Sequence, residues 1–65
     1  MNFKKLKDIL FINGFTYEEV AKTLNISTTT FSNKINGKVD FTLTEIRKLT
    51  QNFNLTDEQL KDIFF

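Results

Sequence analysis

The sequence contains neither cysteine nor histidine. Without cysteine the chain has no disulfide framework and no thiolate metal site. Without histidine it lacks the usual acid-base group at neutral pH and the commonest metal ligand. No pairing of a nucleophile with a base, and no set of metal ligands, can be assembled from the residues that remain. We therefore expect a protein that is not an enzyme and that holds neither a metal nor a cofactor.

Helix-breaking residues are scarce, since proline is absent and glycine occurs only at positions 14 and 37. A chain with so few breakers, and with frequent Leu, Ile, Lys and Glu, is typical of an all-α fold. No apolar run approaches the roughly 18 residues of a membrane span, and no signal-peptide core is present. These absences predict a cytoplasmic protein.

An excess of positive charge is also missing. Nine Lys and Arg against eight Asp and Glu leave a net charge of only +1, whereas a tight nucleic-acid binder is usually strongly basic. The overall charge therefore argues mildly against nucleic acid as a partner, and only the placement of the charges can favour it.

The supply of core residues is adequate for one small domain covering residues 1–65. A chain of this length buries only about 60% of the surface that its unfolded state exposes, so the core has to be efficient. Hydrophobic residues make up 40% of the sequence and include eight Phe and one Tyr. We expect one compact helical bundle with short loops.

A capping pattern that recurs four times divides most of the chain into helices. In each copy an apolar residue precedes a Ser or Thr that can accept from free backbone N–H groups, and a second apolar residue follows five positions after the first. The four caps are Thr16, Ser27, Thr42 and Thr56. An amphipathic stretch precedes them and ends at Asn13-Gly14, a pair favoured at a left-handed helix end. Together these signals predict helices over 3–13, 17–24, 28–36, 43–52 and 57–64.

The connection between the second and third helices is short. Ala21 is small enough to let another helix cross closely, and Asn25 tolerates a left-handed conformation better than other non-glycine residues. Ile26 can point inward, and Ser27 caps the next helix immediately. Two helices joined in this way have the geometry of a helix-turn-helix.

The third helix has an unusual exposed face. Phe31 and Ile35, four residues apart, form its buried stripe, and at about 100° per residue Asn33 falls nearly opposite. Short polar side chains occupy the exposed positions, although Thr, Ser and Asn are mediocre helix formers. This composition indicates a face that recognises a surface; its residues are Thr28, Thr29, Thr30 and Asn33. The alternative for the three threonines is an ordinary capped first turn in solvent.

With these features, residues from about 12 to 50 resemble the Cro/repressor (XRE-like, lambda-repressor-like) helix-turn-helix family of temperate phages. The residues that carry the resemblance are Ala21, Asn25 (commonly Gly in the family), Ile26, Phe31 and Asn36-Gly37-Lys38. The following FTLTEIRKL segment and the Phe-rich end are similar to short phage regulators of low-GC Gram-positive hosts. The resemblance implies a bundle of about five helices whose third helix lies in the major groove.

Position by position, the resemblance implies base-facing roles for Thr28, Thr29 and Asn33. It implies contacts with backbone phosphates for Thr16, Tyr17, Asn36 and Lys38, and we assign Ser32 and Lys34 to phosphate as well. One departure is that the family usually has an apolar residue where this chain has Lys34 and a polar one where it has Ile35, which places Lys34 at the flank of the helix. The alternative for Lys34 and Lys38 is plain surface solubility, and for the Lys4-Lys5-Lys7 cluster it is a solvated face.

Two functions follow as expectations. The first is a Cro-like transcriptional regulator that binds a double-stranded DNA operator. Its half-sites should be rich in A and T, because Asn pairs with adenine, Thr methyl groups pack on thymine, and the third helix has no Arg for guanine. The second is a modulator of repression or antirepressor that binds the phage repressor protein, which the near-neutral charge and the Phe-rich surface favour.

Three apolar residues end the sequence. We expect Ile63 to complete the core against the first helix, and Phe64 and Phe65 to form an interface, because they are a large apolar surface for a monomer to hide. A homodimer would place two recognition helices about one DNA turn apart. The same residues could instead bind another protein.

Overall fold

Each helix of the computed structural model, which describes residues 1–65, begins at a side chain that accepts a backbone hydrogen bond. The predicted caps Thr16, Ser27, Thr42 and Thr56 are confirmed, and Asn2 caps the first helix. Three of them form reciprocal capping boxes, with Glu19, Glu45 and Gln59 returning a hydrogen bond to the cap backbone. These local contacts fix where every helix starts.

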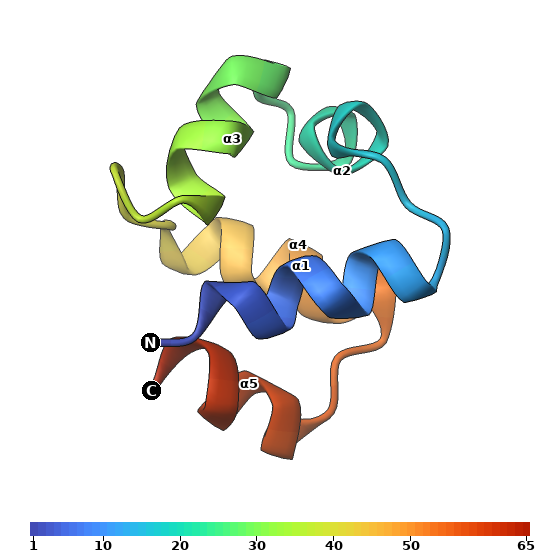
Figure 1. Ribbon diagram of the computed structural model, residues 1–65, viewed down its shortest axis with the longest axis vertical. Helices are drawn as coiled ribbons and strands as arrows, with labels where there is room; N and C mark the ends of the chain where they lie inside the picture. The colour runs from blue at the N-terminus through green and yellow to red at the C-terminus, as the bar shows by residue number, and fades with distance from the viewer.

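Five helices and no strands result (Figure 1). They are α1 Phe3–Ile12, α2 Tyr17–Thr23, α3 Thr28–Ile35, α4 Leu43–Phe53 and α5 Asp57–Phe64. The predicted all-α class is confirmed, and no helix end differs from the predicted one by more than one residue. None of the five helices is both long and apolar enough to cross a lipid bilayer.

Two asparagines in left-handed conformation let the chain turn where no glycine is present. Asn25, between α2 and α3, has φ 60°, as its position in the sequence predicts. Asn54, between α4 and α5, has φ 54°, a conformation that was not predicted at this position. Asn is the non-glycine residue that adopts this conformation at the lowest cost, because its side chain can hydrogen-bond locally.

The core is a single cluster of eleven buried hydrophobic residues drawn from all five helices, the α2–α3 turn and the segment before α5. Phe31 of α3 lies at its centre without exposed surface. Its ring meets Tyr17 edge-on, with centroids 5.2 Å apart, and Phe41 at 6.2 Å. Phe41 in turn contacts Phe3 at 5.4 Å and Phe64 at 5.6 Å. Edge-to-face pairs of this kind join elements that are far apart in the sequence.

In Figure 1, α1 runs across the middle of the molecule, with α2 and α3 on one side and α5 on the other. α2 packs on α3, and α1 packs on both α3 and α5. The two chain ends lie together, since the Asn2 N–H donates to the Ile63 carbonyl at 2.8 Å. Ile63 is fully buried, which confirms that it completes the core.

The prediction that Phe64 lies at an interface is wrong. α5 continues through this residue, so its side chain turns inward and packs edge-on against Phe3 and Phe41. Only 7% of Phe64 is exposed, whereas 88% of Phe65 is exposed. Of the two terminal aromatic residues, only Phe65 is available to a partner.

Candidate nucleic-acid interface

α2 and α3 are joined by a turn whose backbone is hydrogen-bonded at each step. The N–H of Leu24 donates to the Val20 carbonyl, and that of Ile26 donates to the Ala21 carbonyl, both at 3.0 Å. Asn25 between them supplies the positive φ. Ala21 is almost fully buried, so its small side chain lets the start of α3 approach α2. The turn thus fixes the angle at which α3 leaves α2.

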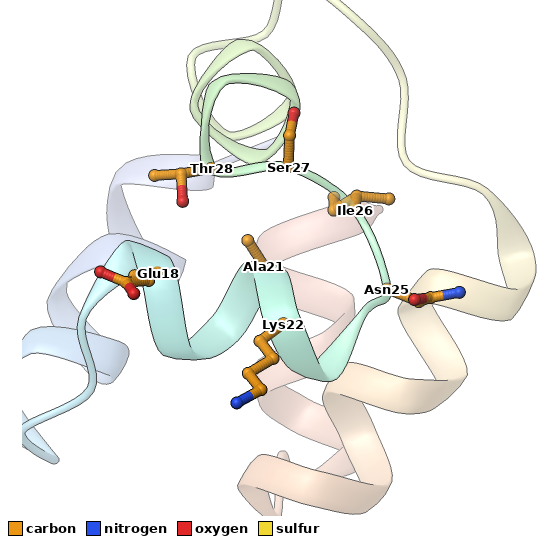
Figure 2. A pocket seen from close by; sticks show the side chains of 7 residues that line it. All are labelled: Glu18, Ala21, Lys22, Asn25, Ile26, Ser27 and Thr28. Atoms are coloured by element: carbon orange, nitrogen blue, oxygen red, sulfur yellow. The ribbon is translucent and has the colours of Figure 1, made fainter.

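A shallow open hollow of about 550 Å³ lies in this corner. Figure 2 shows Glu18 on α2 and Thr28 on α3 at one end of it, Asn25 of the turn at the other, and Lys22 extending away from α3. Most of the lining is polar, and the hollow is wide for its depth. Pockets for small ligands are mostly enclosed and apolar, so this corner is better suited to contact with a macromolecular surface.

The outward face of α3 presents the polar side chains that the sequence singled out. Thr28 and Thr29 are exposed, and Asn33 is half-buried. Thr30 differs, because its N–H donates to the Ser27 hydroxyl at 3.0 Å and its own hydroxyl accepts from Ser27 at 2.8 Å. Thr30 therefore belongs to the cap, and the groups presented outward are those of Thr28, Thr29 and Asn33.

The end of α3 carries a second group of polar residues. The Asn36 amide donates to the Ser32 hydroxyl at 3.4 Å and accepts from the Lys7 ammonium at 2.9 Å. Lys38 follows, with its side chain exposed and its N–H donating to the Asn33 carbonyl. Ser32, Asn36 and Lys38 are thus close in the fold, as a phosphate-contacting group would have to be.

Lys7 joins this group from α1, which the sequence did not predict. It is 29 positions from Asn36, and nothing in the local pattern of α1 distinguishes it from Lys4 and Lys5. Lys5 instead forms an ion pair with Asp62 of α5. Lys5 and Lys7 therefore have different partners, and Lys7 adds positive charge at the end of α3.

At the start of α2, Thr16 and Tyr17 have structural roles. The Thr16 hydroxyl accepts from the Glu19 N–H at 3.2 Å and donates to the Glu19 carboxylate at 3.0 Å. The Tyr17 ring is half-buried against Phe31. Because Thr16 is exposed and Tyr17 partly so, both can still touch a surface that α2 approaches.

Lys34 does not lie where the sequence predicted it. Only 6% of the residue is exposed, and its ammonium lies 3.0 Å from the Glu45 carboxylate and 2.8 Å from the Asp40 carbonyl. The prediction that Lys34 contacts phosphate is therefore wrong. The inward face of α3 includes position 34 together with Phe31 and Ile35, and the acidic partner that neutralises the buried charge comes from the next helix.

The Lys34–Glu45 pair is maintained by further hydrogen bonds. Burial by itself would raise the pKa of the Glu45 carboxyl, but the Thr42 N–H and the Lys34 ammonium outweigh it and hold this pKa below its ordinary value. The Thr42 N–H donates to the carboxylate at 2.8 Å. Glu45 is thus ionised at neutral pH, and the network ties α3 to the segment that precedes α4. Asn36 and Lys38 lie in the loop that this network closes.

Comparison of the chain with protein-family models, with curated proteins and with solved structures finds no match. The resemblance to the Cro/repressor family therefore stays a prediction. No group of three Asp or Glu side chains lies close enough together to hold a metal ion.

Proposed function

We propose that this protein is a Cro-like, sequence-specific DNA-binding regulator of transcription, and that α3 enters the major groove of an operator. The observation that carries the proposal is the division of α3 into two faces. Phe31 and Ile35 anchor one face in the core, while Thr28, Thr29 and Asn33 project from the other beside a tight turn. A helix held in this manner can offer short polar side chains to base edges.

The charge placement supports the proposal better than the net charge does. Lys7 and Lys38 lie at the end of α3, next to the amide of Asn36, where contacts with phosphates would fix the position of the helix on the duplex. Glu18 lies near the start of α3 and would oppose a phosphate placed there. We therefore expect a single domain to bind DNA with modest affinity. The favourable contacts with phosphates should come mainly from the C-terminal end of α3. Such a protein acts in the cytoplasm by occupying its site.

The test is selection of bound duplexes from a pool of double-stranded DNA with a randomised centre. The proposal expects enrichment of a short A- and T-rich motif, because Asn33 can pair with adenine and the threonine methyl groups can pack on thymine. The Asn33→Ala variant should lose that enrichment. If repeated selection yields no motif, and binding to every duplex is equally weak, the proposal fails.

A second function is favoured by one specific observation. Phe65, Met1 and Leu43 are large apolar residues with 88%, 80% and 64% of their surface exposed, on a domain with a net charge of only +1. An antirepressor that binds a phage repressor protein would use such a surface. The salt dependence of binding distinguishes the two functions. The affinity for DNA falls steeply as the salt concentration rises, whereas the affinity of an apolar protein contact does not.

A further inference from the structure

The chain contains two Asn-Gly pairs, Asn13-Gly14 and Asn36-Gly37, whose backbones are closely matched. Each Asn follows the last residue of a helix, α1 or α3, with ψ 4° and 5° respectively. Each Gly has a positive φ, 79° and 80°. The N–H of each Gly donates to the carbonyl three residues earlier, at 3.0 Å and 3.1 Å. The two pairs therefore differ mainly in what surrounds them.

The reaction open to an Asn-Gly pair is loss of ammonia from the Asn side chain, because no Cβ on the Gly obstructs the attack. The Gly backbone nitrogen gives its proton to water and forms a bond to the Asn Cγ, while negative charge develops on Oδ1. The Cγ–Nδ2 bond then breaks, and ammonia leaves with a proton taken from water. The cyclic succinimide that remains is hydrolysed by water at either carbonyl, so the products are Asp and isoaspartate.

The side chain of Asn36 is polarised for this attack, and that of Asn13 is not. The Lys7 ammonium donates to Asn36 Oδ1 at 2.9 Å. This is the atom on which negative charge develops, and a charged donor stabilises such an oxyanion. The leaving group, Asn36 Nδ2, makes only a long hydrogen bond of 3.4 Å to the Ser32 hydroxyl. Asn13 Nδ2 is instead held at 2.7 Å by the Ile9 carbonyl.

The two loops also differ in how freely they can open. The attack requires the Gly N–H to leave its carbonyl acceptor, so it proceeds from a locally opened loop. Residues 36–40 are all exposed, and opening around Gly37 therefore moves side chains that are already in water. Gly14 is followed by Phe15, which is half-buried with its ring centroid 4.6 Å from that of Phe53. Opening around Gly14 disturbs this aromatic pair and costs more.

We propose that Asn36-Gly37 is a self-modifying site, which loses ammonia faster than Asn13-Gly14 because the Lys7 ammonium activates the Asn36 amide. The product carries a carboxylate at position 36, which lowers the formal net charge from +1 to zero. This carboxylate faces Lys7 and opposes a phosphate at the end of α3. The modified protein therefore binds DNA less tightly, a consequence that rests on the proposed function, and binding declines as the protein ages.

The modification is measured on the protein alone, without DNA. Peptide mass mapping during incubation at mildly alkaline pH should show Asn36 reacting at least about tenfold faster than Asn13. Lys7→Met should slow the reaction of Asn36 about tenfold and leave that of Asn13 unchanged. Lys4→Met is the matched control, since it removes the same charge from an exposed position on the same helix, and it should change neither rate. Far-UV circular dichroism shows whether each variant keeps its fold.

The effect on binding is measured with two variants that carry the same change of charge. Asn36→Asp should weaken binding to the selected duplex at least about tenfold, whereas Asn13→Asp should change it by less than about twofold. If the wild type binds no DNA, the proposed function fails, and the two reaction rates still decide the assignment of the site. Equal rates at the two asparagines overturn the proposal, as does a rate at Asn36 that Lys7→Met leaves unchanged. Equal affinities of the two Asp variants overturn the effect on binding.

Discussion

The two faces of α3 differ in almost every physical respect, although they alternate along eight residues. The inward face consists of Phe31, Ile35 and the aliphatic stem of Lys34, all nearly inaccessible to water. The outward face consists of short polar side chains, of which Thr28 and Thr29 are exposed. The inward face stabilises the fold, and we propose that the outward face recognises a ligand. Substitutions on the two faces should therefore change different measured quantities.

The largest effect is expected at the centre of the inward face. Phe31→Ala should lower the free energy of unfolding by about 3–5 kcal/mol, because it leaves a cavity where α3 meets α2 and the segment before α4. That is a large part of the 5–15 kcal/mol typical of a small domain, so the variant should be partly unfolded without denaturant. Urea unfolding followed by circular dichroism measures the change. A loss below about 1 kcal/mol would show that the core can close around the missing ring.

A smaller effect is expected from the charged part of the same face. Glu45→Gln should lower the free energy of unfolding by about 3 kcal/mol, because it leaves the buried Lys34 ammonium without its counter-ion. The double variant Lys34→Met/Glu45→Gln removes the charge as well and should recover most of that loss. If Glu45→Gln lowers the free energy of unfolding by no more than the loss of an exposed ion pair would, about 0–1 kcal/mol, then the Lys34–Glu45 pair is open to water in solution.

Acid should weaken the same pair. The pKa of Glu45 is lower in the folded protein than its ordinary value of 4.5. The carboxylate therefore stabilises the fold fully above the unfolded pKa, and this contribution is lost as the pH falls through the folded pKa. The melting temperature of the wild type should drop more steeply with acidification than that of Glu45→Gln, in which the other carboxyl groups are unchanged. Parallel pH profiles would contradict this account.

The helices could be predicted from the sequence because their signals are local. Thr16, Thr42 and Thr56 each lie three positions before the residue that completes the capping box, and Asn25 lies at the turn itself. Phe31 and Ile35 define the buried stripe of α3, and Thr28 and Thr29 are exposed away from it, as their spacing predicts. Thr30 belongs to the helix cap instead, and the role of these residues at DNA bases stays a prediction.

The failures concern contacts between elements. Lys34 is buried because Glu45 reaches it from another helix, and no rule of helical spacing predicts that partner. The contact of Lys7 with Asn36 also joins two separate elements, α1 and the end of α3, so helical spacing could not predict it either. Phe64 is buried because α5 ends against α1 and aligns its ring with Phe3 and Phe41. Phe65 is the next residue along the chain, yet its side chain points into solvent.

The outward face of α3 should contribute almost nothing to stability. Asn33→Ala and Thr29→Ala should each change the free energy of unfolding by no more than about 0.5 kcal/mol, as is usual for surface substitutions. Thr44→Ala is a matched control for Thr29→Ala, because each threonine is exposed and is the second residue of its helix. All three variants should unfold at nearly the wild-type urea concentration.

Fluorescence anisotropy of these three variants on the selected duplex is the most direct test of the proposed role of α3. Asn33→Ala and Thr29→Ala should each weaken binding by about 1–3 kcal/mol, which is roughly fivefold to 150-fold, because each removes a contact with a base edge. Thr44→Ala should bind as tightly as the wild type. Equal affinities for all four proteins would contradict the claim that the outward face of α3 reads DNA.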